Sequence, residues 1–178
     1  MLKCTQLTLL LPALWVLLSP RGEAVDLNLH GNVIAAACTV SMTLAQGQSV
    51  SLGELGRSKF QRSGDADPNW HNFSLDLTLC PAGTTRSTVT FTGTPDGVDA
   101  TLFANTASSG AAATNIAVQL SKQSDNTAIL SDGSTMTVNV NTGAGTATFP
   151  LAARMKTPTG DVGAGIVYST VLVDFTYQ

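Results

Sequence analysis

The sequence contains few charged residues. Lys, Arg, Asp and Glu make up 12% of its 178 residues, with nine basic residues against twelve acidic ones. No basic patch is evident, so the chain lacks the feature by which proteins bind nucleic acid. Glutamate and lysine, which favour helices, are scarce, whereas Thr, Ser, Gly and Val are abundant. Because β-branched residues and turn formers favour strands and turns, we expect an all-β fold.

Side chains that carry catalysis or bind metals are also rare. His30 and His71 are the only histidines, and we find no Cys or carboxylate partner at metal-ligand spacing. Asp65 and Asp67 resemble the start of a calcium loop but lack its central Gly and closing Glu. A secreted all-β hydrolase would need a grouping of acids, histidines or metal ligands that the sequence does not contain. We therefore expect no metal, no cofactor and no enzymatic activity.

Only one long apolar run is present, near the N-terminus. Leu7–Leu18 follows the basic Lys3 and precedes a small-residue site that ends at Ala24. This is the pattern of a secretory signal peptide, and the run is shorter than the roughly 20 residues that span a bilayer. We expect residues 1–24 to be a signal peptide and the mature chain not to insert into a membrane. The alternative is an uncleaved membrane anchor.

Cysteine is rare as well, with three residues in the chain. Cys4 lies in the predicted signal peptide, which leaves Cys38 and Cys80 as an even pair in an exported chain. Such a pair predicts one disulfide, and two free buried thiols are the alternative. The wide spacing excludes a CxxC redox or zinc motif.

What the sequence does contain is alternation of apolar and polar residues, the pattern of strands with one buried face. Turn signals separate the segments, as expected for a β-sandwich. We expect Phe73, Leu75, Leu77 and Leu79 to lie on one face of their segment, and residues 57–69 to form an exposed loop. We also expect residues 141–145 to be a hairpin connection. The predicted strands of the central region are Ala37–Leu44, Ser49–Leu52, Phe73–Leu79, Ser87–Thr92, Ile116–Leu120, Ala128–Leu130, Thr135–Val140 and Ala147–Met155.

Two alternating segments lie at the ends of the mature chain. The first places an apolar residue or Gly at every second position, namely Val25, Leu27, Leu29, Gly31 and Val33. The second, Ile166–Gln178, places Val171, Val173, Phe175 and Tyr177 on the face that we expect to pack on the core. No further strand follows the second segment, so we expect one edge of it to be open. A long apolar open edge is an aggregation hazard unless something pairs with it, which suggests strand exchange between molecules.

These features resemble, in order and spacing, the pilin subunits of chaperone–usher fimbriae, and especially the minor subunits of type 1 pili. Met155 departs from the family, in which an aromatic residue is common at this position. The matching features are Gly31 two residues before Val33, Cys38, Cys80 at the end of an alternating strand, Phe149–Arg154, Ala164-Gly165 and the terminal segment Val171–Gln178 with its penultimate Tyr177.

The resemblance implies an incomplete immunoglobulin-like β-sandwich that lacks its last strand and is completed by a strand from another molecule. Residues 25–36 would be an N-terminal donor-strand extension, and residues 37–178 the pilin domain. The odd residues Val25–Val33 would fill five pockets of a neighbouring subunit, with Gly31 at a shallow pocket that admits only glycine. Val171, Val173, Phe175 and Tyr177 would line the acceptor groove.

The resemblance also implies partners and a location. A periplasmic chaperone would lend a strand and hold the carboxylate of Gln178 with basic residues, and an outer-membrane usher would exchange that strand for the extension of the next subunit. The product would be an adhesive fimbria on the cell surface. The alternative function is a glycan-binding tip adhesin module. Tip adhesins usually carry a separate lectin domain and lack a donor extension.

Overall fold

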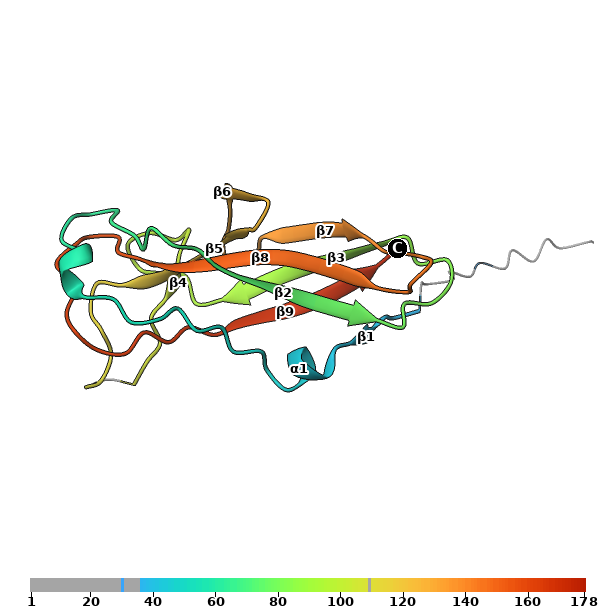
Figure 1. The fold of residues 1–178 in the computed structure, drawn as a ribbon, viewed down its shortest axis with the longest axis horizontal. Coiled ribbons are helices and arrows are strands. Elements are labelled where there is room, and N and C mark those ends of the chain that lie inside the picture. The colour runs from blue at the N-terminus through green and yellow to red at the C-terminus, as the bar shows by residue number, and fades with distance from the viewer. Residues whose placement is uncertain (1–29, 31–35, 109) are drawn as a thin grey trace, which may run out of the picture. The chain divides into compact units, whose positions relative to one another are not determined.

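The computed structural model describes residue 30, residues 36–108 and residues 110–178, and this region is almost entirely β-structure (Figure 1). The predicted signal peptide and all five predicted donor positions lie outside the described residues. Two short helical turns occur, α1 (Met42–Ala45) and η1 (Arg57–Lys59). The strands are β1 (Thr39–Val40), β2 (His71–Thr78), β3 (Arg86–Gly93), β4 (Phe103–Ala104), β5 (Ala117–Lys122), β6 (Asp125–Leu130), β7 (Thr135–Asn139), β8 (Ala147–Lys156) and β9 (Val171–Tyr177).

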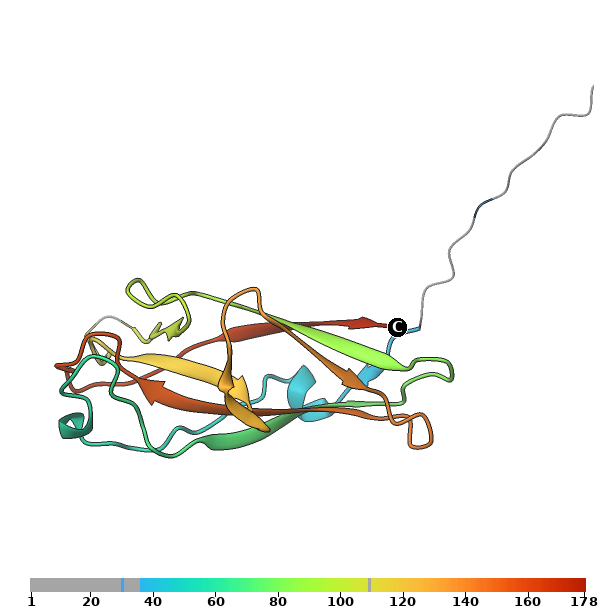
Figure 2. The ribbon, with the colours of Figure 1, turned by 90° about the horizontal axis from the view of Figure 1, so that it is seen from above.

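The strands form two antiparallel sheets that pack face to face (Figure 2). The larger sheet has the order β1-β2-β8-β5-β4, with β6 paired to β5, and the smaller sheet has the order β7-β3-β9. In the smaller sheet Val89 pairs with Phe175 and Gly93 pairs with Val171. The strand β9 therefore stands at an edge of its sheet within the described part of the chain.

The core between the sheets follows the predicted alternation. Val89 and Phe91 of β3 are fully buried, as expected from the sequence, and they face Leu77 and Phe149 of the larger sheet within one apolar cluster. Along β9 the odd residues are half-buried and the even residues are exposed, which confirms the predicted faces of this strand.

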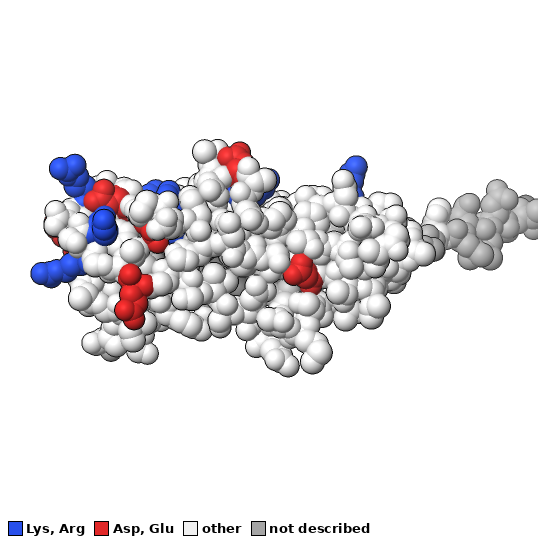
Figure 3. All heavy atoms as spheres, in the orientation of Figure 1, with Lys and Arg blue, Asp and Glu red and all other residues white. Residues whose placement is uncertain are grey.

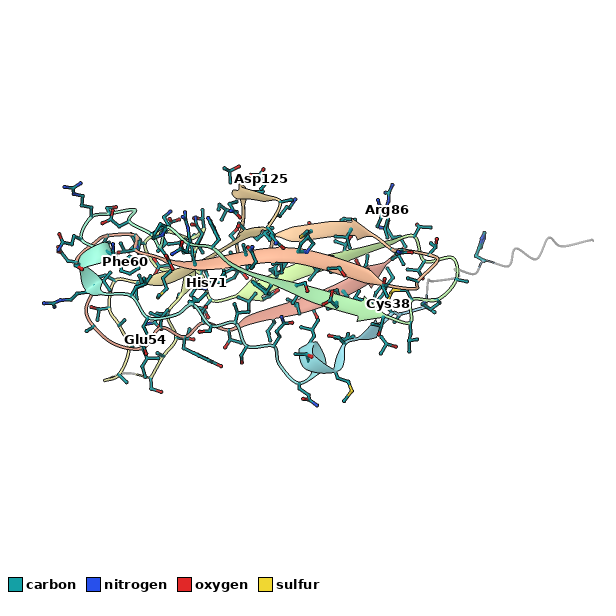
Figure 4. All side chains as sticks on the ribbon, in the orientation of Figure 1. Cys38, Glu54, Phe60, His71, Arg86 and Asp125 are labelled. Carbon is teal, nitrogen blue, oxygen red and sulfur yellow. A yellow bond between two sulfur atoms is a disulfide. The ribbon has the colours of Figure 1, made fainter. Side chains whose placement is uncertain are left out.

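The predicted disulfide between Cys38 and Cys80 is present, with the two Cα atoms 4.1 Å apart. It joins the chain just before β1 to the chain just after β2. Figure 4 places Cys38 at the same end of the body as Arg86, and Phe60 at the opposite end. We call these the Cys38 end and the Phe60 end.

The β5–β6 connection projects from the body (Figure 1). Residues 123–127, which are this connection and the first three residues of β6, are exposed, and Asp125 accepts hydrogen bonds from the amide and the hydroxyl of Thr127. The hydroxyl hydrogen bond is the main reason why the pKa of Asp125 is lowered from its ordinary value. The projection thus has an ordered turn at its tip.

Several predicted elements are wrong. The segment 37–44 is not one strand, because α1 begins after β1 with Ser41 as its N-cap, and the Ser41 hydroxyl accepts from the Leu44 amide. Residues 49–52 form no strand. The last strand is shorter than predicted: β3 ends at Gly93, which pairs with Val171, so residues 166–170 have no opposing residue of β3.

Three other expectations also fail. Leu79 is 76% exposed and does not share the buried face of Leu75 and Leu77, because its φ of 50° takes it out of the extended conformation. The loop 57–69 is not exposed throughout, since Phe60 and Asp67 are buried. Residues 141–145 form no hairpin between β7 and β8, because β7 pairs with β3 and β8 pairs with β2 and β5. They carry the chain from one sheet to the other.

Candidate functional site

The open edge of β9 is one side of the candidate site. This strand pairs with β3 on one side, and in the described part of the chain no strand pairs with its other side. Its main-chain N–H and C=O groups on that side are available to a further strand. An extended segment that paired there would extend the smaller sheet by one strand.

The opposite side of the site is residues 48–55, which we call the wall segment. Gln48, Val50 and Leu52 are half-buried at alternate positions, although the segment belongs to no sheet. Within the described residues it makes no main-chain hydrogen bond to another strand. Its attachment to the body includes the Gln48 side-chain amide, which donates to the carbonyl of Ser74 in β2 at 3.0 Å.

A groove of about 810 Å³ lies between β9 and the wall segment. Leu44, Val50 and Leu52 line it on one side, and residues 167–173 line it on the other. Its floor includes the buried side chains of Leu75, Phe91, Phe103, Leu120 and Leu151. The groove is therefore a long apolar opening into the core between the two sheets.

The predicted acceptor residues lie along this groove and beyond its end. Val171 and Val173 line the groove, whereas Phe175 and Tyr177 continue the same half-buried face toward the C-terminus. The Phe175 ring packs on Phe149, with 5.5 Å between ring centroids. Burial raises the pKa of the Tyr177 phenol, as expected for a hydroxyl at the margin of an apolar core.

Gln178 is held within the chain. Its main-chain oxygen accepts from the amides of Thr85 and Arg86 at 2.6 and 3.0 Å, and its own amide donates to the carbonyl of Arg86 at 3.0 Å. The last residue is thus fixed against the start of β3, at the Cys38 end. The predicted chaperone contact of its carboxylate stays a prediction.

Charge contributes little to the surface around the groove. On the face shown in Figure 3, Lys and Arg gather mainly at the Phe60 end, and the middle of the body carries few charges. Arg57 and Lys59 belong to η1 at that end. A ligand of this groove must therefore be recognised chiefly by main-chain hydrogen bonds and apolar side chains.

Phe103 sets the depth of the groove floor beneath Val171. It is fully buried, and a Cβ placed on Gly93 would lie 2.7 Å from Cδ1 of its ring and 3.1 Å from the carbonyl oxygen of Thr170. Only glycine at this position lets the ring lie flat under the end of β3. The free space next to the ring is the groove itself.

We expect Gly93→Ala to push the Phe103 ring into the groove. Overpacking of this kind destabilises a core by about 1–3 kcal/mol, and a strand entering the groove would also bind less tightly. Chemical denaturation measures the first effect, and titration with a peptide of residues 25–36 measures the second. Gly97→Ala is the matched control, because no atom lies within 4 Å of its added Cβ. Unchanged peptide affinity in Gly93→Ala would contradict this account of the floor.

Sequence reasoning missed a polar cluster in and beside the loop before β2. The carboxylate of the buried Asp67 contacts Nε2 of His71 at 3.2 Å, and its main-chain carbonyl accepts from the Arg154 guanidinium at 3.3 Å. The His71 ring edge lies 3.8 Å from the position that a Cβ would take on Gly53 in the wall segment. The spacing of four residues between Asp67 and His71 was the signal in the sequence that could have indicated this contact.

Arg154 joins this cluster to the larger sheet. Its Nε donates to the side-chain oxygen of the buried Gln119 at 2.8 Å, and its guanidinium stacks 4.2 Å from the centre of the Trp70 ring. Burial lowers the pKa of Arg154, and the charge of Asp67 opposes that shift. The contacts are satisfied within the protein, so the cluster fixes the loop before β2 rather than offering a binding site.

Two searches of the described residues gave negative findings. Among them no three His, Cys, Asp or Glu side chains lie together in a way that could hold a metal ion. In the same part of the chain no helix is long and apolar enough to cross a membrane.

Comparison with known proteins gives consistent results. The model of the fimbrial protein family matches residues 27–178. Protein FimG of Escherichia coli (strain K12) is 35% identical over 170 residues, which cover 94% of this chain and 95% of that protein. The P pilus rod subunit PapA has a TM-score of 0.65 at 18% identity, covering 80% of this chain and 100% of that one. A chaperone–usher pilus structure has a TM-score of 0.63 at 20% identity, covering 89% and 98%. These structural likenesses confirm the predicted fold class.

Proposed function

The chain belongs to the fimbrial protein family and is a structural subunit of a pilus on the cell surface; from this premise we propose that it assembles by strand exchange. In this proposal the groove between β9 and the wall segment accepts an extended segment of a neighbouring subunit. The chain's own residues 25–36 enter the groove of the next subunit in turn. Each copy therefore accepts one strand and donates another.

The observation that carries the proposal is an apolar groove between two segments whose facing main-chain edges have no partner among the described residues. A strand in the groove would gain main-chain hydrogen bonds, each worth about 0.5–1.5 kcal/mol net. Val25, Leu27, Leu29 and Val33 would each contribute roughly 1.5–3 kcal/mol by burial, as an upper estimate. Apolar burial is thus the largest favourable contribution, and the period of two in both segments sets the register.

We also propose a periplasmic chaperone and an outer-membrane usher as partners. An open β-edge and an apolar groove lead to aggregation unless they are covered until assembly. A chaperone that lends a strand would cover both, and an usher would replace that strand with the extension of the next subunit. The described body supports this role by leaving the same edge and groove uncovered.

A peptide of residues 25–36 added to the purified body tests the proposal. A ligand that binds only the folded state stabilises it by about 2.7 kcal/mol when its concentration is a hundred times Kd, so we expect a clear rise in Tm. Differential scanning calorimetry measures the rise. The control peptide replaces Leu27 and Leu29 with Asp, which removes two apolar side chains in whichever register the peptide pairs. Equal stabilisation by both peptides, or by neither, would overturn the proposed exchange.

A further inference from the structure

Leu79 is an unusual residue at the Cys38 end. It is a large apolar side chain with 76% of its surface exposed, and its φ of 50° lies in the left-handed region that Gly and Asn adopt more easily. A Leu at such a position gains nothing from the core of its own subunit. Both its exposure and its conformation suggest a contact with another molecule.

The disulfide keeps Leu79 near the base of the donor extension. Leu79 precedes Cys80, whose Cα is 4.1 Å from that of Cys38. Cys38 follows the last predicted donor residue, Val33, by five peptide units, which reach at most about 18 Å when extended. Wherever the extension binds, Leu79 of the same copy must therefore lie near the end of the bound extension.

The direction of the donated strand decides where Leu79 arrives. All ladders between the named strands of this body are antiparallel, and a complete immunoglobulin-like sandwich is built of antiparallel sheets. A strand that runs antiparallel to β9 ends where β9 begins. The body of the donor then lies beyond the Phe60 end of the acceptor, and the Cys38 end of the donor faces the acceptor.

The acceptor presents an apolar patch at this place. Val167 lines the groove and packs on the cluster that contains Phe60, and its neighbours Ile166 and Tyr168 are 58% and 61% exposed. The main chain of Ile166 is fixed by hydrogen bonds to Ala111 and Ala113. Small uncharged residues lie next to Ile166 in the sequence and also opposite it, where Ala112 forms a β-bridge with Ile166. We call Ala111, Ala112, Ala164, Ile166 and Tyr168 the end patch.

We propose that Leu79 of the donating copy docks on the end patch of the accepting copy. The contact rests on the strand exchange proposed above and adds a body-to-body interface to it. Because one Leu on a small patch covers far less than the area of a standard protein interface, the contact orients successive subunits without holding them together by itself. The donated strand holds them together, and Leu79 limits how far they tilt.

Photo-cross-linking in assembled fibres tests this contact. The full chain carries p-benzoylphenylalanine in place of Leu79, and the matched control carries it in place of Met42, which is 78% exposed but lies in α1. After irradiation and digestion, mass spectrometry identifies the partner peptides. From position 79 we expect cross-links to peptides that contain residues 111–112 or 164–168 of another copy. These cross-links should be absent from unassembled subunits. Their yield should be about tenfold lower from position 42, which corresponds to a difference of about 1.4 kcal/mol in contact free energy.

A second variant separates this inference from the strand exchange. Ile166→Asp places a charge on the end patch but leaves the groove residues unchanged, so fibre yield should stay normal while the cross-link from position 79 falls about tenfold. Normal fibres without cross-links to the end patch, or with cross-links only elsewhere, would overturn the Leu79 contact alone. Failure of the unmodified chain to form fibres would overturn the proposed exchange and this inference with it.

Discussion

Leu29→Asp is expected to abolish polymerisation and to leave the folded body unchanged. The substitution removes roughly 2 kcal/mol of apolar burial in the neighbour's groove. It also places a carboxylate there without a partner, at a cost of several kcal/mol. Together they lower the affinity of the donor strand by at least about a thousandfold, which corresponds to about 4 kcal/mol. A reconstituted assembly assay with chaperone and usher measures polymer yield.

The neighbouring position supplies the control. Asn28→Asp adds the same charge at an even position, which faces outward from the groove in the proposed register. This variant should polymerise normally, and the body of Leu29→Asp should still accept the unmodified 25–36 peptide with the usual rise in Tm. Normal polymer yield from Leu29→Asp, or equal loss in both variants, would refute the assigned face of the donor strand.

Loss of the disulfide is expected to have the next largest effect. Cys38 and Cys80 close a loop with a sequence separation of 42 residues, for which loop-closure entropy gives a stabilisation of about 4 kcal/mol. This is a large part of the roughly 5–15 kcal/mol that stabilises a typical domain. The double variant Cys38→Ala/Cys80→Ala should therefore unfold at a urea concentration lower by about 2 M. Urea unfolding with saturating 25–36 peptide measures the shift.

Reduction provides the matched comparison for this prediction. A thiol reductant should move the unfolding midpoint of the unmodified chain down to that of the double variant, and it should leave the double variant unchanged. A double variant as stable as the oxidised chain would show that the disulfide does not restrict the unfolded state. A shift of the double variant by reductant would show that the effect lies elsewhere.

The sequence predicted those parts of the fold that depend on local alternation. The inward position of Val89 and Phe91 and the two faces of β9 follow from a period of two and hold in the structure. The disulfide follows from the even number of cysteines in an exported chain. In each case a local pattern or a residue count determines the feature, and no contact elsewhere in the chain overrides it.

The remaining features depend on contacts that local pattern does not contain. The predicted strand Ser49–Leu52 lies in the wall segment, which has no partner strand in the described body, so the local pattern predicted a strand that the structure does not form. Leu79 leaves its alternating series because the chain bends into the left-handed region before the disulfide. The depth of the groove floor depends on Gly93 and Phe103, which come together only when β3 and β4 have folded.

The projecting β5–β6 turn has a consequence for the finished fibre as an antigen. Residues 123–127 are polar and exposed, and none of them lines the groove or belongs to the end patch. In a linear assembly every copy would present this turn to the surroundings at the same repeat distance. An antibody raised against this turn would meet a regular array of identical epitopes, which favours bivalent binding. A change of sequence in this turn would alter the binding of such an antibody at little structural cost.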